Sequence, residues 1–141
     1  MTSTIDGSAK AIMVLDDEGD IVFIFRKTLE LAGYGVFAFT DPELALEHLK
    51  TNQDRYGLII SDVRMPKMDG IEFVEKVRKF EPTISIILMS AFSMAELDIQ
   101  PELKIAELLQ KPITPIMLSE TVAKFIKLPN IASPIDRSLV K

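Results

Sequence analysis

Five polar or charged side chains follow apolar runs of the sequence, and their types suit phosphoryl transfer. They are Asp16 and Asp17 after the first run, Asp62 after the third, Ser90 after the fourth and Lys111 after the fifth. A carboxylate can attack phosphorus to give an acyl phosphate, and the transfer needs mainly charge neutralisation on the equatorial oxygens. We expect Asp62 to be the nucleophile because the third strand of such folds lies mid-sheet. The Ser90 hydroxyl and the Lys111 ammonium would then meet the phosphoryl group.

The carboxylates also predict a divalent cation. Two like charges about 4 Å apart repel by roughly 4 kcal/mol at an effective dielectric constant of 20, and Lys111 offsets only part of this repulsion. Mg²⁺ prefers oxygen ligands and typically takes one or two carboxylates. The chain has no cysteine and one histidine, which excludes thiolate and multi-histidine zinc sites. We therefore expect Mg²⁺, for which Mn²⁺ can substitute.

Alternating strands and helices must bring these side chains together. Short apolar runs, typical of strands buried on both faces, alternate with amphipathic stretches typical of helices. The predicted strands are Ala11–Leu15, Val36–Phe39, Leu58–Ile60, Ile84–Met89 and Ala106–Leu109. This order predicts an α/β fold, a doubly wound five-stranded parallel sheet with five helices in three α/β/α layers. Ligands of such sheets bind beyond the carboxyl ends of the strands.

Local sequence signals set the bounds of the predicted helices. They span 20–32, 42–52, 70–80, 92–104 and the stretch from 115 onward. The fourth is the least regular, because Pro101 interrupts it. Thr40 or Asp41 caps the second helix ahead of Pro42.

The first helix carries more apolar residues than one stripe needs. The stripe expected to face the core comprises Ile21, Ile24, Phe25, Thr28, Leu29 and Ala32. Val22, Phe23 and Leu31 fall off this stripe. Exposed apolar clusters often mark partner sites, so we expect Phe23 to lie in a partner surface.

Four segments at the ends of predicted strands resemble the receiver domain of two-component response regulators, which has a CheY-like, flavodoxin-like fold. The segments are Val14–Glu18, Ile60–Gly70, Met89–Ala91 and Lys111–Pro112. Their order and spacing both fit the family, and the resemblance covers residues 9–127. Met65, Pro66 and Gly70 resemble the family's tight turn into the third helix, where glycine tolerates unusual dihedral angles.

The resemblance implies a role for each candidate residue. Asp62 resembles the phosphoacceptor, Ser90 the hydroxyl that follows the phosphoryl group and Lys111 the lysine that pairs with it. Asp17 resembles a direct Mg²⁺ ligand that acts together with Asp62, and Asp16 resembles one that acts through water. The backbone carbonyl of Arg64 resembles a further protein ligand. The Lys111–Pro112 peptide bond is commonly cis in the family.

The resemblance also implies a signalling switch and not an enzyme with a separate substrate. A histidine kinase or a histidine phosphotransfer protein would donate the phosphoryl group, and the chain would catalyse only its own phosphorylation and dephosphorylation. The donor would dock on the first helix and the loop 113–115. The face built from the fourth helix, the fifth strand and the fifth helix would then change its protein partners.

Two features depart from the family pattern. Leu108 stands where an aromatic residue usually reports the switch, so we expect the region around Pro101 to carry the change instead. Phe92 and Arg64 lie two residues beyond Ser90 and Asp62, beside the water path to the phosphoryl group. We expect the bulky Phe92 to slow dephosphorylation by excluding water.

Other function classes fit less well. Leu108 leaves open a phosphorylation-independent interaction module of the same fold. A haloacid dehalogenase phosphatase needs an aspartate two residues after its nucleophile, where this chain has Arg64. A flavodoxin-like cofactor protein needs a phosphate-cradling first loop, and Asp16, Asp17 and Glu18 would repel that phosphate.

Length and charge bound the remaining possibilities. The 141 residues suit one domain, expected over 9–127 between a polar tail (1–8) and a C-terminal tail or linker stub (128–141), with no output or DNA-binding domain. Ser133–Asp136 has helix-start chemistry, and Ile135 and Leu139 are four residues apart. The net charge of −5 disfavours nucleic acid. The apolar runs are far shorter than a membrane span of about 20 residues, and the N-terminus lacks a signal-peptide core, so we expect a cytoplasmic protein.

Overall fold

A five-stranded parallel sheet runs through the fold in the computed structural model, which describes residues 10–128. Its strands are β1 (Ala11–Leu15), β2 (Val36–Phe39), β3 (Tyr56–Asp62), β4 (Ser85–Ser90) and β5 (Glu107–Gln110). They lie in the order β2-β1-β3-β4-β5, and every neighbouring pair is parallel. The strand that ends in Asp62 is therefore central, as the sequence predicted.

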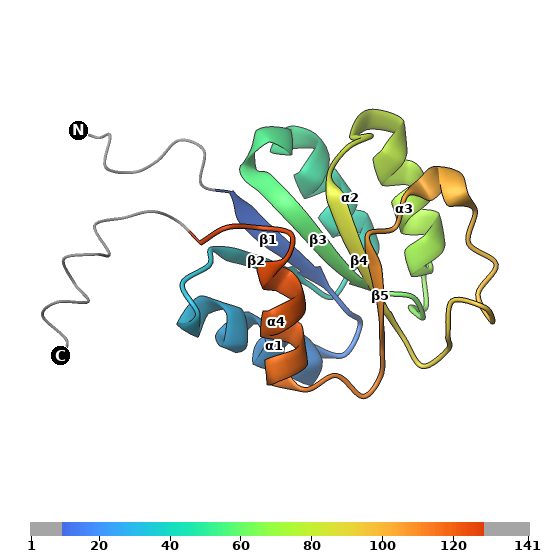
Figure 1. Cartoon of the computed structure of the whole chain (residues 1–141). Helices are drawn as coiled ribbons and strands as arrows, with labels where there is room; N and C mark the ends of the chain where they lie inside the picture. Colours follow the sequence, from blue (N-terminus) through green and yellow to red (C-terminus); the bar gives the residue numbers. More distant parts are fainter. Residues whose placement is uncertain (1–9, 129–141) are drawn as a thin grey trace, which may run out of the picture.

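Helices cover both faces of this sheet and give the predicted three layers (Figure 1). On one face lie α1 (Gly19–Leu31) and α4 (Pro115–Ala123), and on the other lie α2 (Pro42–Thr51) and α3 (Gly70–Phe80). The 3₁₀ helices η1 (Gln53–Arg55) and η2 (Pro101–Leu103) complete the described elements. Among residues 10–128, no helix is long and apolar enough to cross a membrane.

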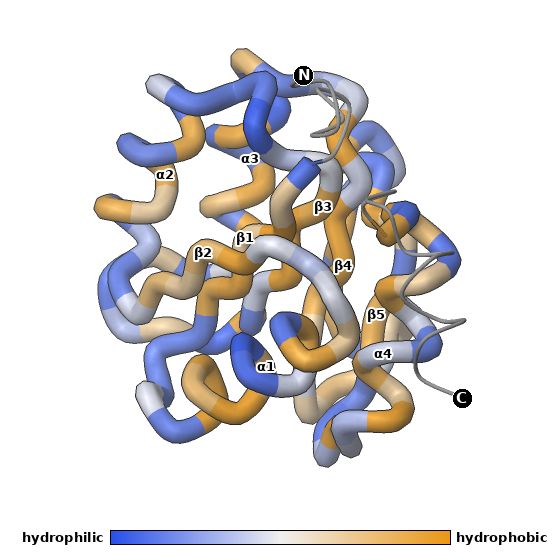
Figure 2. The backbone as a smooth tube through the Cα atoms, turned by 90° about the vertical axis from the view of Figure 1, so that its left-hand side faces the viewer, coloured by the Kyte–Doolittle hydropathy of each residue, from blue (hydrophilic) through white to orange (hydrophobic). Residues whose placement is uncertain are grey.

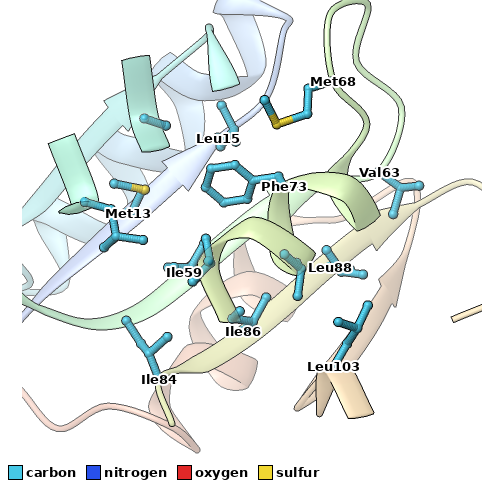
Figure 3. Close-up of a cluster of buried hydrophobic side chains, with 14 of the residues drawn as sticks. Met13, Leu15, Ile59, Val63, Met68, Phe73, Ile84, Ile86, Leu88 and Leu103 are labelled. Carbon is cyan, nitrogen blue, oxygen red and sulfur yellow. The ribbon is translucent and has the colours of Figure 1, made fainter. Parts of the chain in front are cut away.

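Alternate strand residues supply two hydrophobic cores, one on each face of the sheet. Met13 and Leu15 of β1 point toward α2 and α3, where Phe73 fills the cluster (Figure 3). Ile12 and Val14 point toward α1 and α4. Because both faces are covered, the strands are hydrophobic along most of their length (Figure 2).

The fourth of the five predicted helices, over 92–104, is wrong. The described chain has four α-helices, and residues 91–106 between β4 and β5 form turns followed by η2. The Glu96 and Leu97 N–H groups donate to the Ser93 carbonyl and form a turn. Proline lacks the N–H that a helix needs and disfavours helical dihedrals in the residue before it, so Pro101 prevents one helix from running through this stretch. Leu97, Ile99 and Leu103 still pack on the core, as a helix would have done.

The inward stripe of α1 is partly wrong as well. Val22, Phe25 and Leu29 are the buried residues of this helix, whereas Ile24 is 46% exposed. The spacings of three and four residues between the buried side chains select one face, and this face is rotated from the predicted stripe. Phe23 and Leu31 are exposed, at 61% and 88%, as the sequence predicted.

The sequence signals for the helix starts are otherwise confirmed. Asp41 caps α2 by accepting a hydrogen bond from the Glu43 N–H, with Pro42 as the first helical residue. Thr114 caps α4 in the same way through the Met117 N–H. The helix start predicted at Ser133–Asp136 lies outside the described residues. The predicted tail 1–8 also lies outside them, as does all of the tail 128–141 except Leu128.

Candidate functional site

The sheet brings all five predicted side chains to one edge. Asp62 and Ser90 are the last residues of β3 and β4, and the register pairs them with Met89 and Gln110. Asp16 and Asp17 follow β1, and Lys111 follows β5. Because neighbouring parallel strands end at the same edge, residues up to 95 positions apart in the sequence become neighbours.

The three aspartates form a carboxylate cluster. Asp16, Asp17 and Asp62 each offer an oxygen within 4.8 Å of the others, with Asp16 and Asp62 buried and Asp17 exposed. Asp16 Oδ1 accepts a hydrogen bond of 2.9 Å from the Glu18 N–H. Asp16 Oδ2 is buried and has no hydrogen-bond partner within the described part of the chain. A buried carboxylate oxygen without a hydrogen-bond partner, beside two more carboxylates, fits a hard divalent cation.

Lys111 supplies the positive charge that the cluster needs. Its Nζ lies 3.2 Å from Asp62 Oδ1 and 3.6 Å from Asp16 Oδ2. Its backbone N–H donates to the Ser90 carbonyl at 2.8 Å, which anchors the lysine to β4. The Lys111–Pro112 peptide bond is cis, as expected.

Burial dominates the electrostatics of this cluster. It raises the pKa of Asp16 from 3.8 to about 6, against the lowering effect of the Glu18 hydrogen bond. Burial also raises the pKa of Asp62, and the Lys111 ammonium opposes that rise. For Lys111, burial alone would lower the pKa, but the carboxylates of Asp16 and Asp62 together raise it. Lys111 therefore stays charged. Without a metal, burial disfavours the charged forms of Asp16 and Asp62.

Ser90 and Phe92 lie beside the end of β3 that carries Asp62. Ser90 is buried, and its Oγ accepts a hydrogen bond of 2.9 Å from the Phe92 N–H, so its own proton can be donated elsewhere. The Phe92 ring lies under the Arg64 guanidinium, whose carbon is 4.9 Å from the ring centre. Arg64 and Phe92 thus pair across the two loops that follow β3 and β4.

Gly70 is required for a reason other than the predicted one. Among the described residues, Gly33 is the glycine with a positive φ, so Gly70 needs no unusual dihedral angle. A Cβ at Gly70 would instead overlap the backbone carbonyl of Asp62. The Gly70 N–H donates to the Val63 carbonyl at 2.7 Å. Glycine therefore lets α3 start directly against the end of β3.

Sequence reasoning missed one ion pair beside the cluster. Lys67 Nζ lies 3.2 Å from Asp41 Oδ2 and ties the loop after β3 to the start of α2. Asp17, Asp41 and Lys67 help to line a cleft of about 290 Å³ there. Nothing in the sequence pairs these two residues, which are 26 positions apart. The cap role predicted for Asp41 is correct but incomplete.

Comparison with known proteins identifies the family to which the chain is similar. The family described as the response regulator receiver domain matches residues 12–123. The receiver protein CpdR of Brucella abortus is 31% identical over 104 residues, which cover 73% of this chain and 85% of CpdR. The alkaline phosphatase synthesis transcriptional regulatory protein PhoP of Bacillus subtilis is 33% identical over 127 residues, which cover 89% of this chain. The chain spans about half of the length of PhoP (52%).

Solved structures show the same fold. The chemotaxis protein CheY4 of Vibrio cholerae matches with a TM-score of 0.76 and 29% identity, covering 83% of this chain and 98% of CheY4. The response regulator TrrA of Thermotoga maritima, solved in complex with Mg²⁺-BeF, matches with a TM-score of 0.73 and 30% identity, covering 83% of this chain and 99% of TrrA. Receiver domains bind Mg²⁺ through acidic residues and act as signalling modules with kinases and downstream partners. With its parallel sheet, its aspartate cluster and a family match over most of its length, this chain belongs to the response regulator receiver domains of two-component systems.

Proposed function

We propose that this chain accepts a phosphoryl group on Asp62 from a histidine kinase or a histidine phosphotransfer protein and thereby switches its protein partners. The observation that carries the proposal is the convergence of Lys111 Nζ on Asp62 Oδ1 at 3.2 Å within a cluster of three carboxylates. A structural ion pair would not need the second and third carboxylates, which add repulsion.

The proposed metal ligands are the carboxylates of Asp16, Asp17 and Asp62 and the backbone carbonyl of Arg64. When bound there, Mg²⁺, or Mn²⁺ in its place, would neutralise charge on the phosphoryl oxygens. The unpaired Asp16 Oδ2 supports this assignment, because a metal or a metal-bound water would satisfy it.

In the proposed reaction, a carboxylate oxygen of Asp62 forms a bond to phosphorus while the bond from phosphorus to the donor's histidine nitrogen breaks. The Lys111 ammonium already touches this carboxylate and would pair with the new phosphoryl oxygens. The Ser90 hydroxyl would donate to one of them. No other substrate is consumed, so the chain catalyses only its own phosphorylation and, with water, its own dephosphorylation.

The proposed readout runs from Ser90 into residues 91–106. Movement of Ser90 Oγ toward the phosphoryl group would break its hydrogen bond with the Phe92 N–H and release the start of this segment. The far end is fixed, because the Arg78 side chain donates to the carbonyls of Leu103 and Lys104. We expect residues 91–100 to move relative to β5 and α4, so that the face these elements share exchanges partners.

The proposed donor surface lies on α1 and the loop after β5. Phe23 is exposed there, and the Lys27 ammonium lies over its ring, 5.8 Å from the ring centre. A cleft of about 380 Å³ opens between α1 and this loop and is lined by Glu18, Ile21, Phe25, Lys111, Pro112 and Ile113. A donor seated there would meet Lys111 directly.

We assign the receiver domain to residues 9–127, with tails at 1–8 and 128–141. We place its action in the cytoplasm. Its partners would be proteins, because the net charge of −5 disfavours nucleic acid.

Beryllofluoride, a phosphoryl mimic, tests the switch. We expect Mg²⁺ with beryllofluoride to shift the amide resonances of residues 91–100 while those of Leu103 and Lys104 change little. The Asp62→Asn variant should show no shift in the same titration. Changes confined to the metal cluster, with residues 91–100 unmoved, would refute the proposed readout.

One observation favours a second candidate, a phosphorylation-independent interaction module. Leu108 of β5 is partly buried against the core, so the chain lacks the aromatic side chain that usually moves at this position. An absence of any response to beryllofluoride in the Mg²⁺-loaded chain would support that module.

A further inference from the structure

An aromatic cluster lies between α2 and β2, which is an edge strand of the sheet. Phe37 and Phe39 of β2, His48 of α2 and Tyr56 of β3 form it, with the centres of contacting rings 5.3–5.8 Å apart. The Tyr56 hydroxyl lies 2.9 Å from His48 Nδ1, and this hydrogen bond fixes the imidazole in the cluster. Tyr56 is buried, whereas the other three rings are half-buried. Part of the aromatic surface therefore faces solvent.

The cluster already holds one cation of the chain. The Arg55 guanidinium lies over the Phe37 ring, with its carbon 5.3 Å from the ring centre. The negative face of an aromatic ring attracts a cation within about 6 Å in this way. Within residues 10–128, no lysine or arginine lies over the Phe39 ring. Lys50 of α2 is turned elsewhere, since its ammonium lies 5.8 Å from the centre of the Phe80 ring.

A cleft of about 420 Å³ opens beside the Phe39 ring. It is lined by Phe39, Leu44, Glu47, His48 and Thr51. The Thr51 hydroxyl is bonded to the backbone carbonyls of Glu47 and His48, at 3.3 and 3.2 Å, which leaves the Glu47 carboxylate as the anionic group of the cleft. Glu47 is exposed and forms no ion pair within the described part of the chain. The cleft thus offers aromatic faces and a negative charge, but no cation to pair with them.

We propose that this cleft binds an arginine side chain of a protein partner. A planar guanidinium can stack on an aromatic ring and donate hydrogen bonds to a carboxylate at the same time. Leu44, 57% exposed at the cleft, adds an apolar surface that a residue next to that arginine would cover. A free small cation would leave Leu44 in solvent, so the fitting occupant is a segment of a protein. The net charge of −5 also favours a basic partner.

This surface is separate from the proposed donor surface. The helix α2 covers the face of the sheet opposite to α1 and α4 (Figure 1). A partner seated on the cleft beside α2 would therefore leave α1 and the loop after β5 open. The partner should bind whether or not a phosphodonor occupies the other face.

An NMR titration of the ¹⁵N-labelled full chain tests the proposal. The probe is the peptide acetyl-Leu-Arg-Leu-amide, and the comparison is the same peptide with citrulline, which keeps the shape of arginine without its charge. We expect saturable shifts of the amides of Phe39, Leu44, Glu47 and His48 with the arginine peptide. The citrulline peptide should bind ~5- to 30-fold more weakly, because it lacks both the cation–π contact and the ion pair.

Substitutions in the chain locate the contacts. Glu47→Gln and Phe39→Leu should each weaken binding of the arginine peptide by ~2- to 5-fold. Glu120→Gln removes the same charge from an exposed position of α4, on the opposite face of the sheet, and should change nothing. Leu44→Ala should weaken binding of the peptide but not of acetyl-arginine-amide, which has no neighbouring apolar residue.

Three results would overturn the proposal. The arginine and citrulline peptides could bind equally well, or the shifts could fail to saturate or fall outside the cleft. Acetyl-arginine-amide could also bind as tightly as the peptide, with no effect of Leu44→Ala, which would replace the protein segment with a free small cation. The titrations use neither a metal nor a phosphoryl group, so their failure would leave the proposed phosphorylation of Asp62 intact.

Discussion

The Arg64 guanidinium stacks on the Phe92 ring, with its carbon 4.9 Å from the ring centre. Arg64 lies two residues beyond Asp62, and Phe92 lies two residues beyond Ser90. The pair therefore joins the two loops that border the proposed phosphoacceptor. A cation–π contact at an exposed site contributes about 0.5–1 kcal/mol.

This pairing predicts slow loss of the phosphoryl group. Attacking water would have to displace the stacked side chains, so Phe92→Ala should speed dephosphorylation by ~2- to 5-fold, the rate equivalent of the contact energy. Intact mass measured over time after removal of the donor gives the rate. Arg64→Ala with Phe92→Ala should add little to either single change, because both remove one contact. Equal rates in the single variants and the parent would contradict the pairing.

The raised pKa of Asp16 predicts how the stability of the metal-free protein depends on pH. Burial raises this pKa from 3.8 to about 6, so between these values the folded chain keeps a proton that the unfolded chain has lost. The free energy of unfolding therefore falls as the pH rises through this window. Asp16→Asn should reduce the fall, leaving the smaller contribution of Asp62, and be more stable than the parent at pH 7, by on the order of 1–3 kcal/mol.

Urea unfolding in the presence of a chelator, at pH 4 and pH 7, measures this difference. Added Mg²⁺ should reduce or reverse it, because binding stabilises only a chain with its carboxylates intact. A parent that is more stable at pH 7 than at pH 4 without metal, with no change in Asp16→Asn, would contradict the assigned burial effect.

Two glycines give a matched test of backbone packing at the site. A Cβ at Gly70 would overlap the Asp62 carbonyl, so Gly70→Ala should destabilise the fold by about 1–3 kcal/mol and weaken Mg²⁺ binding by shifting Asp62. Gly19→Ala is the control, since a Cβ there meets nothing within 4 Å. It should be neutral or stabilise by up to about 1 kcal/mol. Similar losses in both variants, measured by urea unfolding, would count against the close approach.

The exposed Phe23 ring predicts that one substitution will change the rate of phosphoryl transfer from a protein donor but not from a small-molecule donor. Phe23→Ala should slow transfer from a histidine kinase, which must dock, and leave phosphorylation by acetyl phosphate unchanged. The loss of a single aromatic contact of about 1–2 kcal/mol would give a ~5- to 30-fold slower transfer. Leu44→Ala is the control, because Leu44 is equally exposed on α2. Equal transfer rates from the kinase would remove Phe23 from the donor surface.

The convergence of these residues was predictable from sequence because each lies within two positions of the end of an apolar run, and parallel strands end at one edge. Asp16, Asp62 and Lys111 meet for this reason, and their spacing in the chain is enough to place them. The same reasoning could not find the Lys67–Asp41 pair, since two loops set that distance and neither has a periodic pattern.

The two errors in the fold have local causes. The apolar residues of 92–104 resemble one face of a helix, yet Leu97 and Ile99 reach the core from turns because Pro101 blocks the helix. In α1 two apolar stripes overlap, and composition alone does not tell which one faces the sheet. The structure selects Val22, Phe25 and Leu29 and leaves Ile24 in solvent.

The central claim is that Asp62 is a metal-dependent phosphoacceptor, and intact mass spectrometry after incubation with acetyl phosphate and Mg²⁺ tests it most directly. We predict a gain of one phosphoryl group in the parent chain, and none in Asp62→Asn or in the parent with a chelator. A gain that persists in Asp62→Asn or without metal would contradict the account, as would no gain in a parent chain that also fails to bind beryllofluoride.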